Sequence, residues 1–252
     1  MPMHNWKSVT AGTYHFFHHR WISAISDHLN AGLLPSGLFA MAEQMIGGPA
    51  PDVVTLQSWS KPPEDAPSDG GGIGLAEPTV APTSTYILES HAEAYVTKKS
   101  QIVVRHELGQ VVAVIELVSP GNKHSNFELQ RLIGKSVSLI RSGINLLIVD
   151  PFPPTVRDPN GVPALVWEQL EGECDFQLPN ARTLTVSSYQ AEPQWERKAY
   201  IEPLEVGDPL PNIPLFLVDH RYIDLPLEET YIETWSKLPS QVQGAVDGSA
   251  AS

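Results

Sequence analysis

The clearest hydrophobic pattern in the chain covers residues 111–150. Val111 to Val118 is almost continuously apolar, which predicts a strand that is covered on both faces near the middle of a sheet. Phe127 to Ser142 has apolar side chains at three- and four-residue steps, which predicts an amphipathic helix. A second apolar run follows at 145–150. The unit has the length of a crossover, so we expect 145–150 to pair parallel to 111–118.

Weaker patterns surround this unit and predict further helices and strands. Helices are expected at 13–30, 38–45, 162–170 and 228–235. Strands are expected at 52–59, 85–88, 183–188 and 199–206, and a hairpin is expected from 101–107 and 111–118. Residues 210–214 are punctuated by proline and predict a turn. These elements predict the α+β class, with a mixed central β-sheet and flanking helices.

Two segments predict no regular structure. Residues 60–82 are rich in proline, glycine and acids, which predicts a flexible loop. Residues 239–252 are mostly small and polar, and we expect a disordered tail. Residues 1–238 are then expected to form a single domain, because too little chain precedes the loop to fold alone.

Composition and charge narrow the function classes. The formal net charge is −13 over 252 residues, which argues against non-specific nucleic-acid binding by the whole surface. Residues 98–141 hold seven Lys or Arg and three Glu, a local balance of +4, so an anionic ligand is still possible there. The cationic candidates are Lys98, Lys99, Arg105, Lys123, Arg131 and Lys135.

The expected compartment is the cytoplasm. Cys174 is the one cysteine, which excludes an internal disulfide and fits a reducing environment. No apolar run has the length of a membrane span, so no membrane partner is expected. The first residues lack the basic and apolar regions of a signal peptide.

The strongest candidate chemistry is a set of acids with a nearby lysine. Glu43, Asp52 and Glu116 each lie near the end of a predicted element, and Lys123 and Lys135 follow Glu116. Hard divalent cations such as Mg²⁺ bind two or three such oxygen ligands, which would place the carboxylates of Asp52 and Glu116 about 4–6 Å apart. The alternative is that the acids only end their elements and that Glu116 forms an ion pair with one of the two lysines.

Histidines offer a second, separate candidate. His15, His18 and His19 are spaced so that they share part of a helix face, as transition-metal ligands do. The pattern lacks the glutamate of a metalloprotease helix, and packing or surface exposure is the simpler interpretation. His106 and Glu107 end a predicted strand near Glu116 and either join its site or face solvent.

A series of ordered motifs runs through residues 1–238. The motifs are H-x-W from His4, F-H-H from Phe17, L-N-x-G-L-L-P from Leu29, A-E-Q from Ala42, P-D-V from Pro51, V-R-H from Val104, I-E-x-V-S-P-G-N-K from Ile115, G-I-x-L-L-x-V-D from Gly143, G-D-P-L-P-x-x-P-L-F-L from Gly207 and P-L-E-x-T-Y from Pro226. Together they resemble the bacterial family known as domain of unknown function 4058. The resemblance implies a bacterial protein and leaves its activity open.

Residues 38–150 also resemble the Uma-type endonuclease-like proteins of the PD-(D/E)xK nuclease superfamily. This resemblance implies a restriction-endonuclease-like core in which Asp52 and Glu116 hold Mg²⁺ and a lysine assists. The sequence departs from the motif at Val118, which stands where the lysine is expected, so Lys123 or Lys135 must substitute. Glu107 is the rival of Asp52 for the first acid.

Two hypotheses follow from these patterns. The first is a magnesium-dependent nuclease or phosphodiesterase that acts on nucleic acid or another phosphate-bearing ligand. The second is a non-catalytic binding or assembly module on the same fold, in which the acid and lysine form a buried ion pair. The patterns do not predict an oligomeric state.

Overall fold

The computed structural model describes residues 3–42, 53–57, 85–89, 110–191, 197–217 and 221–249. Its described helices are η1 (Trp6–Ser8, 3₁₀), α1 (Ala11–His28), η2 (Leu29–Leu33, π), α2 (Pro120–Lys123), α3 (Asn126–Arg141), α4 (Gly161–Glu171), α5 (Leu227–Ser236) and α6 (Ser240–Ser249). Its described strands are β1 (Leu38–Ala42), β2 (Val53–Gln57), β3 (Tyr86–Glu89), β4 (Gln110–Leu117), β5 (Asn145–Asp150), β6 (Leu184–Gln190), β7 (Lys198–Leu204), β8 (Asn212–Phe216) and β9 (Tyr222–Pro226).

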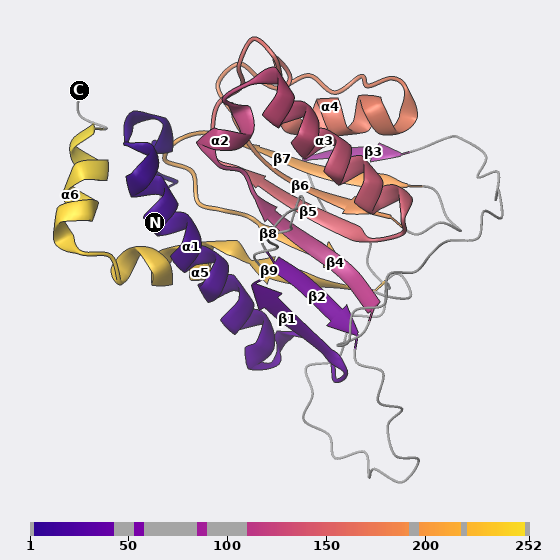
Figure 1. Cartoon of the computed structure of the whole chain (residues 1–252), viewed down its shortest axis with the longest axis horizontal. Coiled ribbons are helices and arrows are strands. Elements are labelled where there is room, and N and C mark those ends of the chain that lie inside the picture. Colours follow the sequence, from indigo (N-terminus) through magenta and orange to yellow (C-terminus); the bar gives the residue numbers. More distant parts are fainter. Residues whose placement is uncertain are drawn as a thin grey trace, which may run out of the picture.

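The described strands form a large mixed sheet and a small hairpin (Figure 1). The large sheet has the order β1-β2-β4-β5-β6-β7-β3, and β8 pairs with β9. Of the pairings in the large sheet, β4 with β5 is parallel and the others described are antiparallel. The chain is therefore of the α+β class with a mixed sheet, as the hydrophobic pattern predicts.

The unit at 111–150 is the centre of this sheet. Strands β4 and β5 pair from Ala113 with Asn145 to Leu117 with Val149, and every residue of β5 is buried. Helix α3 connects the two strands and buries its apolar stripe, which includes Leu129, Ile133 and Val137. The predicted parallel pairing is thus confirmed.

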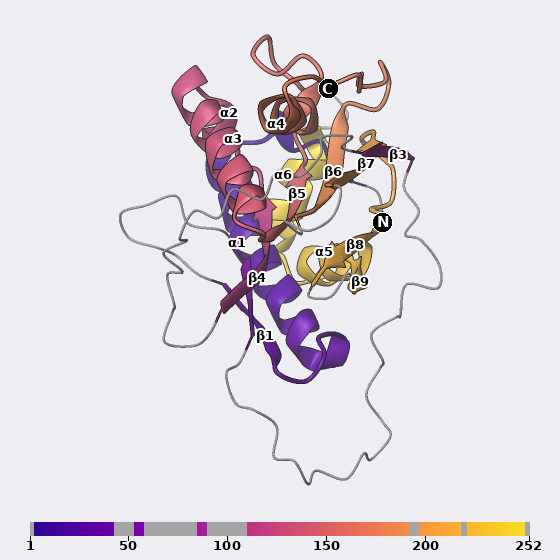
Figure 2. The same ribbon diagram turned by 90° about the vertical axis from the view of Figure 1, so that its right-hand side faces the viewer.

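Two layers cover the sheet on opposite faces (Figure 2). Helices α2, α3 and α4 lie on one face, while β8, β9 and α5 lie on the other. The side chains follow this division, since Glu116 reaches Lys135 on α3, whereas Asn145 donates a hydrogen bond to the carbonyl of Leu217 after β8. Helix α1 packs against α5 and β1 and buries Phe17, Trp21 and Ile25.

The prediction of a helix at 38–45 is wrong for residues 38–42, which form β1. Strand β1 pairs with β2 from Leu38 opposite Gln57 to Ala42 opposite Val53. Asn30 also binds the backbone of Ala40, accepting from its N–H at 2.8 Å and donating to its carbonyl at 2.9 Å. These tertiary bonds outweigh the high helix propensity of a segment made mainly of Leu, Ala and Met.

Two further predictions are corrected near the end of the chain. The proline-punctuated turn at 210–214 overlaps β8, whose Pro214 lies in a two-stranded hairpin where its missing N–H is tolerated. The tail predicted to be disordered forms α6 over residues 240–249. Helix α6 is ordered because Val246 is buried and Gln243 donates a hydrogen bond to the carbonyl of Trp235.

Some predictions concern residues that the structure does not describe. The loop at 60–82 and the first hairpin strand at 101–107 lie outside the described residues. The hairpin pairing predicted for 111–118 is wrong for the described strand, because β2 and β5 are the neighbours of β4. Among the helices that are described, none has the length and hydropathy needed to cross a membrane.

Candidate functional site

Glu116 and Lys135 form a buried ion pair between strand and helix. The Nζ of Lys135 lies 2.5 Å from Oε2 of Glu116, and the two side chains are 9% and 8% exposed. Glu116 is the seventh residue of β4 and pairs with Ile148 on β5. The acid that the sequence predicts at the end of a buried strand is therefore present, and its charge is balanced by a lysine from α3.

Helix α3 is positioned by both of its ends. Ser125 caps its first turn by accepting a hydrogen bond from the N–H of Glu128 at 3.2 Å. Gly143 follows the last turn with a φ of 78°, a left-handed conformation that favours glycine and turns the chain into β5. Between these ends the buried stripe faces the sheet, and Lys135 lies beside the stripe, where its ammonium can reach β4.

Lys123 belongs to a different cluster. Its Nζ lies 2.9 Å from Oδ2 of Asp150 and 2.7 Å from Oδ2 of Asp158, and it donates to the carbonyls of Phe152 and Pro153 at 3.2 Å each. Of the two lysines that the sequence leaves open, the structure brings Lys135 to Glu116. The ammonium of Lys123 instead joins the end of β5 to the loop that follows it.

This second cluster holds one lysine between two buried acids. Burial alone lowers the pKa of Lys123, but Asp150 and Asp158 outweigh that effect, and the net shift is upward. Burial raises the pKa of Asp150 to about 6, because one ammonium does not offset both the dry environment and the nearby charge of Asp158. Sequence reasoning missed this cluster. Two signals were visible: Asp150 at the end of a predicted strand, and the spacing of Thr155 and Asp158, which are hydrogen-bonded in the structure.

The remaining predicted acids lie outside the described residues, as does His106. Asp52, Glu43 and Glu107 are not among the described residues, so the predicted distance between Asp52 and Glu116 stays a prediction. The strand register is described for the residues next to Asp52 and Glu43 in the sequence. Val53 is opposite Ile115 on β4 and opposite Ala42 on β1. Across the described ranges, no group of three or more His, Cys, Asp and Glu side chains has the arrangement of a metal site.

The basic residues of 98–141 do not form one continuous exposed patch among the described residues. Lys123 is buried, the side chain of Lys135 is 9% exposed, and both lysines are paired with acids, so they add little to the exposed charge. Arg131 is more exposed and pairs with Glu128 at 3.1 Å on the same helix. Lys98, Lys99 and Arg105 lie outside the described residues.

The three histidines of α1 have different environments. His18 is buried, and its Nε2 forms a 3.0 Å hydrogen bond with the carbonyl of Leu117 at the end of β4. His15 is exposed and His19 half-buried, and their Nε2 atoms lie 3.0 Å apart. Packing therefore explains His18, whereas His15 and His19 form a pair at the surface.

No protein-family model matches the chain, and it matches neither a curated protein nor a solved structure at a significant level. The assignment of a function therefore depends on the motifs and on the geometry described above.

Proposed function

We propose that this protein is a magnesium-dependent phosphodiesterase with a restriction-endonuclease-like core, and that Asp52, Glu116 and Lys135 form its active site. The observation that carries this proposal is the contact between Glu116 on β4 and Lys135 on α3. A lysine next to the motif glutamate is what the nuclease resemblance requires. Val118 occupies the usual lysine position, and Lys135 supplies an ammonium from the helix instead.

The strand register supports Asp52 as the second acid. Val53 is opposite Ile115 at the end of the described pairing, where Asp52 precedes Val53 in the sequence and Glu116 follows Ile115. Residues directly opposite each other in an antiparallel pair point to the same face of the sheet. The proposal requires this pairing to continue by one residue, which would bring both carboxylates to the face that α3 covers. Ala42 is opposite Val53, so the same extension would bring Glu43 to that end of the sheet.

The proposed roles follow from charge. The carboxylates of Asp52 and Glu116 suit Mg²⁺, which prefers oxygen ligands. Mg²⁺ bound there would polarise a phosphoryl oxygen and lower the pKa of a bound water. Without the metal, Lys135 balances the buried carboxylate of Glu116. With the metal in place, the same ammonium is available to orient the attacking water or to stabilise charge on the phosphate.

A cleavage assay with matched variants tests this function. Wild-type protein is incubated with Mg²⁺ or Mn²⁺ and with plasmid DNA, single-stranded DNA, RNA and a chromogenic phosphodiester. We expect at least one substrate to be cleaved and Glu116→Gln to lose about 100-fold or more of that activity. Glu128→Gln removes a partly exposed acid from α3 and is expected to keep the wild-type rate. Absence of cleavage by the wild type, or an active Glu116→Gln variant, would contradict the proposal.

Lys135→Met separates metal binding from catalysis. This variant keeps the carboxylate of Glu116 and removes the ammonium beside it. We expect it to bind the metal at least as tightly as the wild type, because the ammonium of Lys135 no longer competes for the carboxylate. Its cleavage rate is expected to fall, since the water or phosphate loses its positive partner.

The burial of the ion pair favours a second candidate function, a non-catalytic binding or assembly module. Both side chains are less than a tenth exposed and already satisfy each other's charge. Under this alternative the pair only fixes α3 on the sheet, and the protein binds no Mg²⁺ through Glu116. The double variant Glu116→Gln, Lys135→Met would then bind the same ligands or partner proteins as the wild type.

A further inference from the structure

The surface histidine pair of α1 is separate from the site around Glu116. His15 and His19 are four residues apart, so they lie on the same face of the helix on successive turns. Their Nε2 atoms converge to 3.0 Å, and their rings are nearly perpendicular at 85°. His18, between them in sequence, turns inward to the carbonyl of Leu117.

The distance between the two nitrogens fits a shared metal ion. Imidazole nitrogens bind first-row transition metals at about 2.0–2.1 Å, so two nitrogens 3.0 Å apart subtend about 95° at the metal. A tetrahedral site would need a separation of about 3.4 Å at the same bond lengths. An angle near a right angle is that of neighbouring ligands in octahedral or square-planar coordination, which Ni²⁺ and Cu²⁺ adopt.

We propose that His15 and His19 chelate a divalent transition metal of the Ni²⁺ or Cu²⁺ type through their Nε2 atoms. Metal binding requires both Nε2 atoms to be unprotonated, with the ring protons on Nδ1. Without metal, a proton on one Nε2 gives the hydrogen bond that the 3.0 Å distance also describes. Among the described residues, no third His, Cys, Asp or Glu side chain joins this pair in a group that could hold a metal ion.

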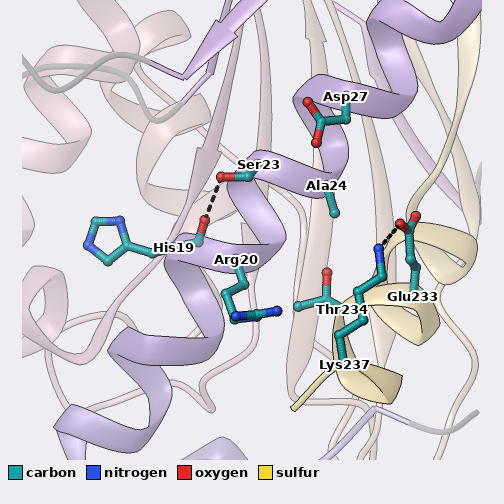
Figure 3. Close-up of a pocket in the computed structure, with 8 residues that line it drawn as sticks. All are labelled: His19, Arg20, Ser23, Ala24, Asp27, Glu233, Thr234 and Lys237. Carbon is teal, nitrogen blue, oxygen red and sulfur yellow. Dashed lines mark hydrogen bonds and ion pairs between the residues drawn. The ribbon is translucent and has the colours of Figure 1, made fainter.

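His19 also borders a neighbouring groove. The groove has a volume of about 390 Å³, lies between α1 and α5, and includes Asp27, Glu233 and Lys237 in its lining (Figure 3). The ring of His19 points away from these charged side chains. The proposed metal site is therefore distinct from the charged part of this groove.

Titration calorimetry with NiCl₂ on the tag-free full chain tests the proposal. We expect one Ni²⁺ per chain for the wild type, and affinity at least about tenfold weaker for both His15→Gln and His19→Gln. Even residues that only orient a metal ligand typically change affinity by about 10- to 100-fold. His124→Gln, which removes an exposed histidine at the end of α2, should bind as the wild type does. Glu116→Gln should also retain Ni²⁺ binding, which distinguishes this site from the proposed magnesium site.

Three results would overturn the histidine site. The wild type could bind no Ni²⁺, either histidine variant could bind as tightly as the wild type, or the loss could occur equally in His124→Gln. Circular dichroism of each variant establishes that α1 is folded, and both substituted side chains are at least partly exposed, so folding is expected to be unaffected.

Discussion

The Nζ of Lys135 on α3 lies 2.5 Å from Oε2 of Glu116 on β4, and less than a tenth of either side chain is exposed. A buried ion pair of this kind couples the helix to the sheet energetically. We expect Lys135→Met to lower the free energy of unfolding by about 3 kcal/mol, because the carboxylate of Glu116 loses its ammonium partner in a dry environment. The double variant with Glu116→Gln should lose less unfolding free energy than the sum of the losses in the two single variants.

A double-mutant cycle by urea denaturation measures this coupling. The matched control is the pair of Glu128 and Arg131, which lies on the same helix with side chains that are 31% and 56% exposed. Its coupling energy is expected to be below about 1 kcal/mol. Additive effects at Glu116 and Lys135 would show that the two groups do not interact in solution.

The cluster of Lys123, Asp150 and Asp158 predicts a pH dependence of stability. The pKa of Asp150 rises from 3.8 to about 6 on folding, so between these values the folded chain binds a proton that the unfolded chain does not. The stabilisation that comes from protonation of Asp150 is complete below about pH 4 and is lost as the pH rises through about 6. The free energy of unfolding is expected to lose about 3 kcal/mol from this residue as the pH rises through that range.

Denaturation of the wild type and Asp150→Asn between pH 4 and pH 7 is the relevant measurement. The difference in unfolding free energy, wild type minus variant, should decrease with rising pH across this window. Asp175→Asn removes an exposed acid and should leave the slope unchanged. A constant difference between the wild type and Asp150→Asn would mean that Asp150 does not take up a proton there.

Asn145 connects three parts of the fold through its side-chain amide. The amide donates to the carbonyls of Leu217 at 2.7 Å and Val112 at 3.4 Å and accepts from the N–H of Ala191 at 2.9 Å. We expect Asn145→Leu to cost about 2–4 kcal/mol, because backbone groups at these positions lose buried partners. Asn126→Leu at the exposed start of α3 is the control and should change stability by less than about 0.5 kcal/mol. Equal melting temperatures for the two variants would contradict this role.

The hydroxyl of Tyr231 fixes the beginning of the chain. It accepts hydrogen bonds from Nε1 of Trp6 at 3.1 Å and from the backbone N–H of His4 at 3.2 Å. Tyr231→Phe removes this acceptor and is expected to cost about 2 kcal/mol. Hydrogen exchange at residues 4–6 should accelerate in this variant, whereas Tyr86→Phe, at an exposed tyrosine of β3, should leave it unchanged.

Strong hydrophobic periodicity made the centre of the fold predictable. The stripe of α3 and the apolar runs of β4 and β5 report directly which faces are buried, and the structure has these elements within a residue or two of the prediction. The sequence was less informative where tertiary contacts decide the conformation. Strand β1 is held by β2 and by Asn30, and α6 by contacts such as that of Gln243 with Trp235.

The candidate site was predictable only in part. Burial of Glu116 follows from the apolar strand around it, and so does its need for a cationic partner. Which lysine fills that role depends on how α3 crosses β4, and no local pattern reports this angle. Lys123 is the closer lysine in sequence, but Asp150 at the end of β5 and Asp158 in the loop that follows bind it instead.

Titration of the wild type and Glu116→Gln with Mg²⁺ by calorimetry tests the central claim most directly. Mg²⁺ prefers oxygen ligands, so the histidine pair on α1 should not contribute to the signal. The account predicts a binding heat and a rise in melting temperature for the wild type and for Glu128→Gln, with both effects absent in Glu116→Gln. Absence of Mg²⁺ binding by the wild type, or equal binding by Glu116→Gln, would contradict a magnesium site at Glu116.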